Sequence, residues 1–206
     1  MMDDFVLGRY RLMRLFLSEI GLHDKVLLDI GAGGNPISMG LKCKQTITVD
    51  IRADAAPSLV CNFIDGIPLS DNSVDVAIAG EILEHLTDAR RFLREVRRVL
   101  RSDGYLLLSV PNIVSLKYRF AFLCGHIPAL AAKADYTYLP DNPAYPRGHV
   151  RDYSFREVRK VLWDQGFRVI AERSVGVHFK GRRVVPPWLI PTSFSDSVVV
   201  KALLSK

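Results

Sequence analysis

Cysteine is scarce in this sequence. Only three occur among 206 residues, Cys43, Cys61 and Cys124, and they form no C-x-x-C pair. An odd number of widely spaced cysteines argues against both a disulfide framework and a zinc site. We therefore expect three buried thiols that behave as small apolar side chains, and no bound metal.

Long apolar segments are also absent. The least polar stretch, Phe120 to Ala132, is interrupted by His126 and Pro128 and is shorter than the ~20 residues that a membrane-spanning helix needs. The first residues pass directly into a charged amphipathic pattern, without the basic start, apolar run and cleavage site of a signal peptide. We expect no transmembrane helix and a cytoplasmic location.

The composition is typical of a folded chain, and residues 1–206 are expected to form a single domain. Apolar residues make up 49% and charged residues 24%, with a net charge of +6 that would attract phosphates, nucleic acid or an anionic membrane. Between Arg90 and Arg101 six arginines alternate with apolar residues at helical spacing. This pattern favours the solvated face of an amphipathic helix, with nucleic-acid binding as the alternative.

Short apolar runs alternate with helical patterns as far as Pro111, which is typical of parallel βαβ units. A capping box, Ser154 to Glu157, predicts a helix that ends at Gly166. Two later runs predict an antiparallel pair at one sheet edge. The six predicted strands are 26–30, 46–49, 74–79, 105–110, 167–171 and 197–204.

A glycine turn, Asp29-Ile30-Gly31-Ala32-Gly33, follows the first strand. Glycine lets the backbone turn sharply and approach a ligand closely, and Asn35 and Pro36 fit the cap and first position of a short helix. The second strand ends in Asp50, where nucleotide-binding folds place a carboxylate for the ribose hydroxyls. Pro36 occupies the place of the third small residue of a dinucleotide fingerprint, so an adenosine ligand is expected and NAD is disfavoured.

These motifs resemble the class I S-adenosylmethionine (SAM)-dependent methyltransferases, specifically the small-molecule group with the ubiquinone-biosynthesis-type enzymes. The resemblance covers Val26 to about Val110, and the later part is similar to methionine-biosynthesis-associated and glycan- or lipid-cluster methyltransferases. It implies a Rossmann-like α/β fold with a mostly parallel seven-stranded sheet, an antiparallel edge and helices on both faces. Its further motifs are Val49-Asp50, residues 61–75, Glu81-Ile82-Leu83-Glu84-His85-Leu86, residues 100–105 and Val110-Pro111-Asn112.

The resemblance also implies a set of cofactor-binding residues, with S-adenosylhomocysteine as the product. Gly31, Ala32 and Gly33 would lie under the methionine part of SAM, and Asp29 would receive its amino group. Asp50 would hold the ribose. The adenine would lie against Ile51 and the pair Asn62 and Phe63, and the switch point of the sheet would contribute Gly80 and Glu81.

Methyl transfer from a sulfonium is an in-line displacement, so the protein need supply only alignment and desolvation. The expected acceptor is a small molecule, a lipid or a glycan. A hydroxyl acceptor would benefit from a base, and His85 and His149 are the candidate catalytic residues. For His85, a structural role at a helix start is the alternative.

The stretch 111–153 breaks the alternating pattern and is rich in tyrosine and proline. We predict an acceptor-selecting lid there, with additional core packing as the alternative.

The segment 184–191, preceded by Lys180, Arg182 and Arg183, is a candidate for peripheral membrane contact. Two other functions stay open: an RNA-directed methyltransferase or non-catalytic nucleic-acid-binding module, and an NAD-dependent oxidoreductase. The sequence leaves the oligomeric state open.

Overall fold

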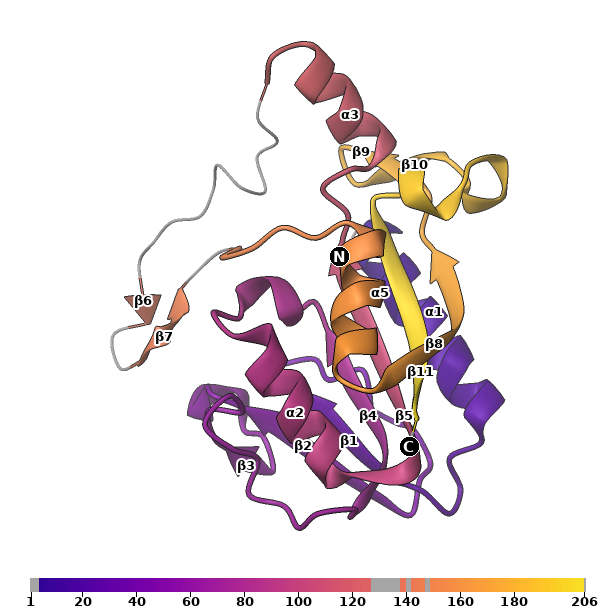
Figure 1. Ribbon diagram of the computed structural model, residues 1–206. Coiled ribbons are helices and arrows are strands. Elements are labelled where there is room, and N and C mark those ends of the chain that lie inside the picture. The colour runs from indigo at the N-terminus through magenta and orange to yellow at the C-terminus, as the bar shows by residue number, and fades with distance from the viewer. Residues whose placement is uncertain (1–3, 127–137, 140–141, 147–148, 206) are drawn as a thin grey trace.

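The structure, a computed structural model, describes residues 4–126, 138–139, 142–146 and 149–205. Its main sheet has seven strands, in the order β3-β2-β1-β4-β5-β11-β8 (Figure 1). The first five are parallel, and β11 is antiparallel to both of its neighbours. The strands are β1 (Val26–Ile30), β2 (Gln45–Asp50), β3 (Leu59–Val60), β4 (Val74–Gly80), β5 (Leu100–Pro111), β8 (Phe167–Ser174) and β11 (Ser197–Leu204). The predicted mostly parallel sheet with an antiparallel edge is confirmed.

Helices cover both faces of this sheet, as predicted. Helix α1 (Asp4–Ile20) packs on one face through Met13, Phe16 and Leu17. Helices α2 (Ala89–Val99) and α5 (Phe155–Asp164) pack on the other face (Figure 1). All five residues of β1 are buried, because a parallel strand covered on both sides has no solvated face.

Smaller elements follow β5 and β8 in the chain. Helix α3 (Leu116–Leu123) follows β5, and two hairpins lie beyond it, β6 (Tyr138–Leu139) with β7 (Asn142–Pro146) and β9 (Val177–Phe179) with β10 (Arg182–Val185). Four short 3-10 turns complete the described elements: η1 (Ala53–Ala55), η2 (Leu83–His85), η3 (Pro187–Leu189) and η4 (Thr192–Phe194). In the described ranges, no helix combines the length and the apolarity that crossing a bilayer requires.

The predicted helix after Pro36 is wrong, because this segment forms a series of turns. Its backbone groups find partners outside the segment. The carboxylate of Asp29 accepts the N–H of Ser38 at 2.8 Å, and the guanidinium of Arg14 donates to the carbonyls of Ile37 and Met39. A helix would use the carbonyls of Ile37 and Met39 for its own hydrogen bonds, whereas the N–H of Ser38, in its first turn, would have no partner within it.

The predicted burial of all three thiols is also wrong. Cys43 and Cys61 are half-buried, and Cys124 is exposed. Cys124 caps the carboxyl end of α3, a helix without a single buried residue. All three are free thiols.

The capping box of α5 is present as predicted. The Ser154 hydroxyl accepts the N–H of Glu157, and the Glu157 carboxylate accepts the N–H of Ser154. We expect Ser154→Ala to lower the free energy of unfolding by about 1 kcal/mol, whereas Ser154→Gly should lower it by only a few tenths. Urea denaturation measures both, and equal losses would show that the hydroxyl is not a cap.

Candidate functional site

The glycine turn sits where β1 ends, beside the carboxyl end of β2. Gly31 and Gly33 adopt φ values of +67° and +53°, which glycine accepts without strain. The N–H groups of Gly31 and Ala32 both donate to the carbonyl of Val49, at 2.8 and 3.2 Å. These bonds fix the turn against the end of β2. A Cβ on Gly31 would lie 2.0 Å from Cδ1 of Ile82, so any other residue there would have to displace the Ile82 side chain.

Asp50 anchors the same turn from the end of β2. One carboxylate oxygen accepts the N–H of Gly33 at 2.8 Å, and the other accepts the N–H of Arg52 at 2.9 Å. Each oxygen keeps a further lone pair, so the group can accept two more hydrogen bonds. A carboxylate at this place suits a diol such as the ribose.

A cavity of about 70 Å³ opens beside the turn. Helix α1 contributes Arg9, Tyr10 and Met13 to its walls, and β5 contributes Ser109. Five of the predicted cofactor residues also line it: Asp29, Gly31, Ala32, Gly80 and Glu81. The structure therefore brings the predicted methionine-binding half of the site together.

Asp29 is a buried carboxylate in the wall of this cavity, with 1% of its surface exposed. Burial raises the pKa of its carboxyl, and the hydrogen bond from Ser38 opposes this rise. A cationic ligand would stabilise its charged form. An ammonium group is such a ligand.

Glu81 lies across the cavity in a left-handed conformation, with φ +56°, which is unusual for a residue other than glycine. Its N–H donates to the carbonyl of Ser109 at 3.1 Å, and its carboxylate forms an ion pair with Arg9. Arg9 thereby places a guanidinium beside Glu81 in a cavity that Asp29 also lines. The cavity thus offers sites for both charges of an amino-acid zwitterion.

The predicted adenine-binding residues lie on the loops after β2 and β3 and do not line this cavity. The side-chain oxygen of Asn62 accepts the N–H of Ile64 at 3.0 Å, and its amide donates to Asp65. Phe63 is buried and packs edge-on against Phe92, with ring centroids 5.6 Å apart. Ile51 is half-buried against the core. Their role toward adenine stays a prediction.

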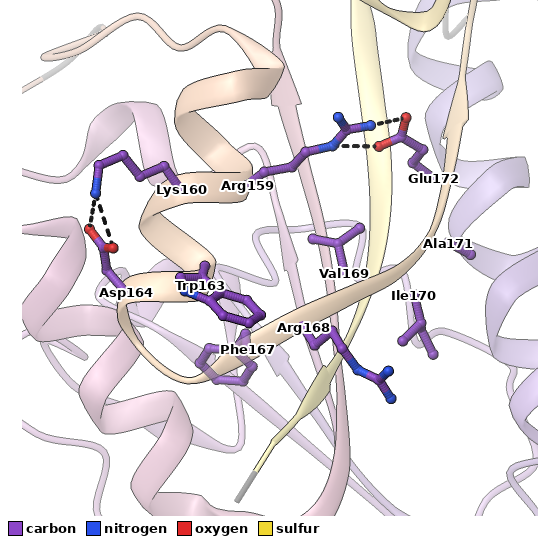
Figure 2. Close-up of a pocket in the computed structure, with 10 residues that line it drawn as sticks. All are labelled: Arg159, Lys160, Trp163, Asp164, Phe167, Arg168, Val169, Ile170, Ala171 and Glu172. Carbon is purple, nitrogen blue, oxygen red and sulfur yellow. Dashed lines mark hydrogen bonds and ion pairs between the residues drawn. The ribbon is translucent and has the colours of Figure 1, made fainter.

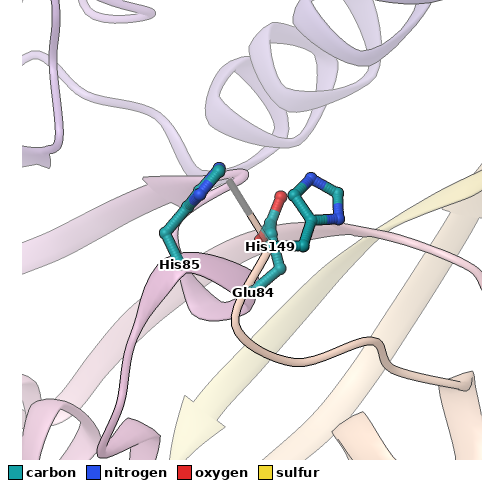
Figure 3. A group of neighbouring side chains, drawn as sticks. All are labelled: Glu84, His85 and His149. Atoms are coloured by element: carbon teal, nitrogen blue, oxygen red, sulfur yellow. The ribbon is translucent and has the colours of Figure 1, made fainter. Parts of the chain in front are cut away.

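The two predicted catalytic histidines lie together, next to a third residue (Figure 3). The rings of His85 and His149 meet edge to face, with centroids 5.1 Å apart. Glu84 lies with them, and one ligand atom from each of the three residues falls within 4.8 Å of the others. The N–H of Val150 donates to the carbonyl of Glu84 at 2.8 Å, which ties the His149 segment to η2.

A larger hollow of about 620 Å³ lies between α5 and β8 (Figure 2). The glycine turn follows β1, the third strand of the sheet, whereas β8 is the seventh. Four of its charged residues pair with each other, Arg159 with Glu172 and Lys160 with Asp164, and Arg168 also lines it. This hollow offers no chemistry for the site.

The segment that carries the glycine turn is similar in sequence to known methyltransferases. Residues 28–108 match the model of the methyltransferase domain family. A Mycobacterium tuberculosis protein named a probable S-adenosylmethionine-dependent methyltransferase is 36% identical over 105 residues, 51% of this chain and 31% of that protein. The matched segment, 28–108, is similar to the domain of SAM-dependent methyltransferases. The chain spans only 31% and 34% of the length of such mycobacterial relatives, so the activity of the whole protein is proposed below.

Solved methyltransferases share the fold of this domain. A SAM-dependent methyltransferase from Thermotoga maritima is 19% identical, with a TM-score of 0.65 over 98% of this chain and 93% of that one. An N1-methyltransferase from Burkholderia thailandensis, solved with 1,6-didemethyltoxoflavin and S-adenosylhomocysteine, is 16% identical, with a TM-score of 0.60 over 97% and 79%. At these identities the likeness shows the fold alone.

The residues present fit SAM, the cofactor of this methyltransferase domain. Asp29 and Glu81 would face its ammonium, Arg9 its carboxylate, and Asp50 its ribose. The cavity is large enough only for the amino-acid end, but the turn beyond it is open, because a Cβ on Gly33 or Gly34 would meet no atom within 4 Å. The sequence analysis missed Arg9 and Tyr10, since α1 carries no motif that points to the site.

Proposed function

We propose that this protein transfers the methyl group of SAM to a hydroxyl group of a lipid or lipid-linked glycan at an anionic membrane surface. The observation that carries the proposal is an exposed apolar and basic face at the end of the molecule where the parallel strands end. We call it the apolar-basic face. Its exposed members are Phe120, Leu123, Phe179, Trp188 and Leu189, with the cations Arg119, Lys180, Arg182 and Arg183.

This face is assembled from α3, β9, β10 and η3, which lie at one end of the molecule (Figure 1). Lys117 of α3 forms an ion pair with Asp196 at 3.1 Å, and Arg119 lies over the ring of Phe194 at 4.6 Å. These contacts join α3 to the segment before β11. Helix α3 also follows directly on the carboxyl end of β5, so the face borders the cofactor edge.

The composition of the face matches an anionic lipid surface better than a single protein partner. Trp188 is 78% exposed and Leu123 is 85% exposed, and large apolar side chains are rarely left in water in such a group. Tryptophan and leucine partition into the interfacial region of a bilayer, while lysine and arginine attract its anionic headgroups. A lipid acceptor would then be presented next to the cofactor.

The reaction needs few groups from the protein. Bound SAM supplies a methyl group that its positive sulfur already activates. Asp29, Glu81 and Arg9 would hold and orient the amino-acid end. His85 lies four positions after Glu81, and the ring of His149 meets that of His85. We propose that these two histidines assist the loss of the acceptor's hydroxyl proton.

The segment 111–153 is proposed to select the acceptor. Its described part includes α3, where Phe120 and Phe122 are exposed instead of packed in the sheet core. Residues 127–137 of this segment, with Tyr136 among them, lie outside the described residues. Tyr153, at the other end, is buried in the core and anchors the segment.

Two of the six arginines between Arg90 and Arg101 are engaged in close contacts within the protein, and Arg90, Arg91, Arg94 and Arg97 are exposed. Arg98 donates to Glu95, Asp71 and two backbone carbonyls, and Arg101 pairs with Asp75. Guanidinium groups engaged in this way lock α2 onto the loop before β4. They are poorly placed to bind phosphates.

The acceptor class can be tested with SAM carrying a radioactive methyl group. Incubation with a total lipid extract should move label into the organic phase, whereas RNA and water-soluble metabolites should stay unlabelled. Label on RNA, or only on water-soluble products, would contradict the lipid proposal.

Membrane contact makes a separate prediction. The double variant Trp188→Ala and Leu189→Ala should lower binding to vesicles containing phosphatidylglycerol by about tenfold or more, because each side chain loses its buried area in the interface. Binding should also weaken with salt. Vesicle sedimentation measures both effects. Trp163→Ala is the matched control, since Trp163 is 69% exposed but lies on α5; equal losses in both variants would refute the assigned face.

A further inference from the structure

The carboxylate of Glu84 is buried without a hydrogen-bond partner. Only 1% of the residue is exposed, and neither oxygen has a hydrogen bond from any of the described residues. A buried charged group without a partner is costly and rare, and calls for an explanation such as an ion. Burial and the nearby carboxylates of Glu81 and Asp152 raise the pKa of Glu84.

Two imidazoles surround this carboxylate. His85 follows Glu84 in η2, and His149 reaches the same place from the segment before α5 (Figure 3). Their ligand atoms lie within 4.8 Å of one another. Ligand atoms bound to one ion through bonds of ~2.0–2.2 Å lie roughly 3–4 Å apart, so small side-chain rotations close the group.

A further carboxylate holds one of these rings. Nδ1 of His149 lies 3.5 Å from Asp152 Oδ1, within ion-pair distance but without a hydrogen bond, and Nε2 is the other nitrogen that the ring can offer to an ion. Metal-binding histidines commonly present their second nitrogen to a carboxylate in this way, which fixes the tautomer and the ring orientation.

We propose that Glu84, His85 and His149 bind one divalent transition-metal ion, with Asp152 as a positioning residue. Two imidazoles and one carboxylate are a ligand set that suits Zn²⁺ and, with open positions, Fe²⁺ or Mn²⁺. Mg²⁺ and Ca²⁺ prefer oxygen ligands throughout and should bind poorly. This differs from our expectation of no metal, which rested on cysteines and so ignored Glu and His ligands from distant segments.

The proposed ion would activate the acceptor hydroxyl, and this role rests on the methyl transfer proposed above. Its three protein ligands leave a position for the acceptor oxygen, and a bound hydroxyl loses its proton more readily. The proton goes to solvent water, the acceptor oxygen forms a bond with the methyl carbon, and the carbon–sulfur bond breaks. S-adenosylhomocysteine leaves as a neutral thioether.

Metal binding can be measured on the protein alone. After treatment with EDTA and dialysis against Zn²⁺, elemental analysis should find one Zn²⁺ per chain. Competition with a chromophoric chelator should show that Glu84→Gln and His149→Asn each weaken Zn²⁺ binding by at least tenfold, and that Asp152→Asn weakens it by about tenfold. Mg²⁺ in excess should not displace the ion.

His23→Ala is the matched control, because His23 also pairs with an aspartate, Asp24, but is 94% exposed. It should bind Zn²⁺ like the parent chain. Circular dichroism and SAM titration verify that each variant is folded. No retained Zn²⁺, or equal affinity in the Glu84→Gln and His149→Asn variants, would overturn the site. Methylation by a chain that binds no metal would then leave the proposed function standing. Zn²⁺ binding by a chain that methylates no lipid would support the metal site and contradict the proposed function.

Discussion

Replacing Gly31 with valine should abolish SAM binding. The residue has φ +67°, and any Cβ there would lie 2.0 Å from the side chain of Ile82. The left-handed conformation alone costs an L-residue ~1–2 kcal/mol, and a β-branched side chain adds two more atoms in the same space. We therefore expect the affinity for S-adenosylhomocysteine to fall by ~100-fold or more in calorimetric titration.

Two further variants separate ligand approach from simple strain. Gly176→Ala imposes similar strain elsewhere, since Gly176 has φ +86° and its Cβ would lie 2.3 Å from the carbonyl oxygen of Val185. It should lower the melting temperature and leave the affinity of the folded protein unchanged. Gly31→Ala combined with Ile82→Ala relieves the clash with Ile82. Parental affinity in this double variant would mean that Gly31 serves packing alone.

The parallel core of the fold was predictable because burial on both faces leaves a direct trace in sequence. In β1 and β4 nearly every position is apolar, as helices cover both sides of these strands. The bounds were less predictable. Strand β5 begins at Leu100, five residues before the expected start, because it pairs with β4 at Leu100 and then again from Tyr105, past an irregular stretch around Gly104.

The absent helix after Pro36 shows where local signals fail. Asn35 and Pro36 are suited to a helix start, yet a helix forms only if its backbone groups pair with each other. Here Arg14 donates to the carbonyls of Ile37 and Met39, and Tyr10 donates to the carbonyl of Asn35. Such competition comes from side chains on other elements and leaves no local signature.

Some residues of the candidate site were predictable from the sequence, and others depend on contacts between distant elements. Asp29, Gly31 and Asp50 stand at strand ends, so the order of strands and turns alone places them at one edge of the sheet. The pairing of Arg9 with Glu81 joins residues 72 positions apart and needs the packing of α1 to exist. Glu84 stood within a recognised motif, but only the structure shows that its carboxylate is buried without a hydrogen-bond partner among the described residues.

Asp50→Ala should weaken SAM binding by at least tenfold. Two charge-assisted hydrogen bonds to the ribose would be lost, each worth ~1.5–3 kcal/mol. The substitution also removes the acceptor for the N–H groups of Gly33 and Arg52, so part of the loss would come from a loosened turn. Asp50→Asn distinguishes the two effects, because its amide oxygen still accepts one backbone N–H while the charge is gone.

The matched control for Asp50 is Asp54→Ala. Asp54 lies four positions further on and pairs with Arg52, but its side chain is 68% exposed and faces away from the turn's hydrogen bonds. Calorimetry should therefore give the parental affinity for SAM in Asp54→Ala, a weaker one in Asp50→Asn and the weakest in Asp50→Ala. NAD should produce no binding heat with any of them. If a folded Asp50→Ala protein binds SAM as tightly as the parent, the ribose lies elsewhere, and the carboxylate serves only to hold the glycine turn against β2.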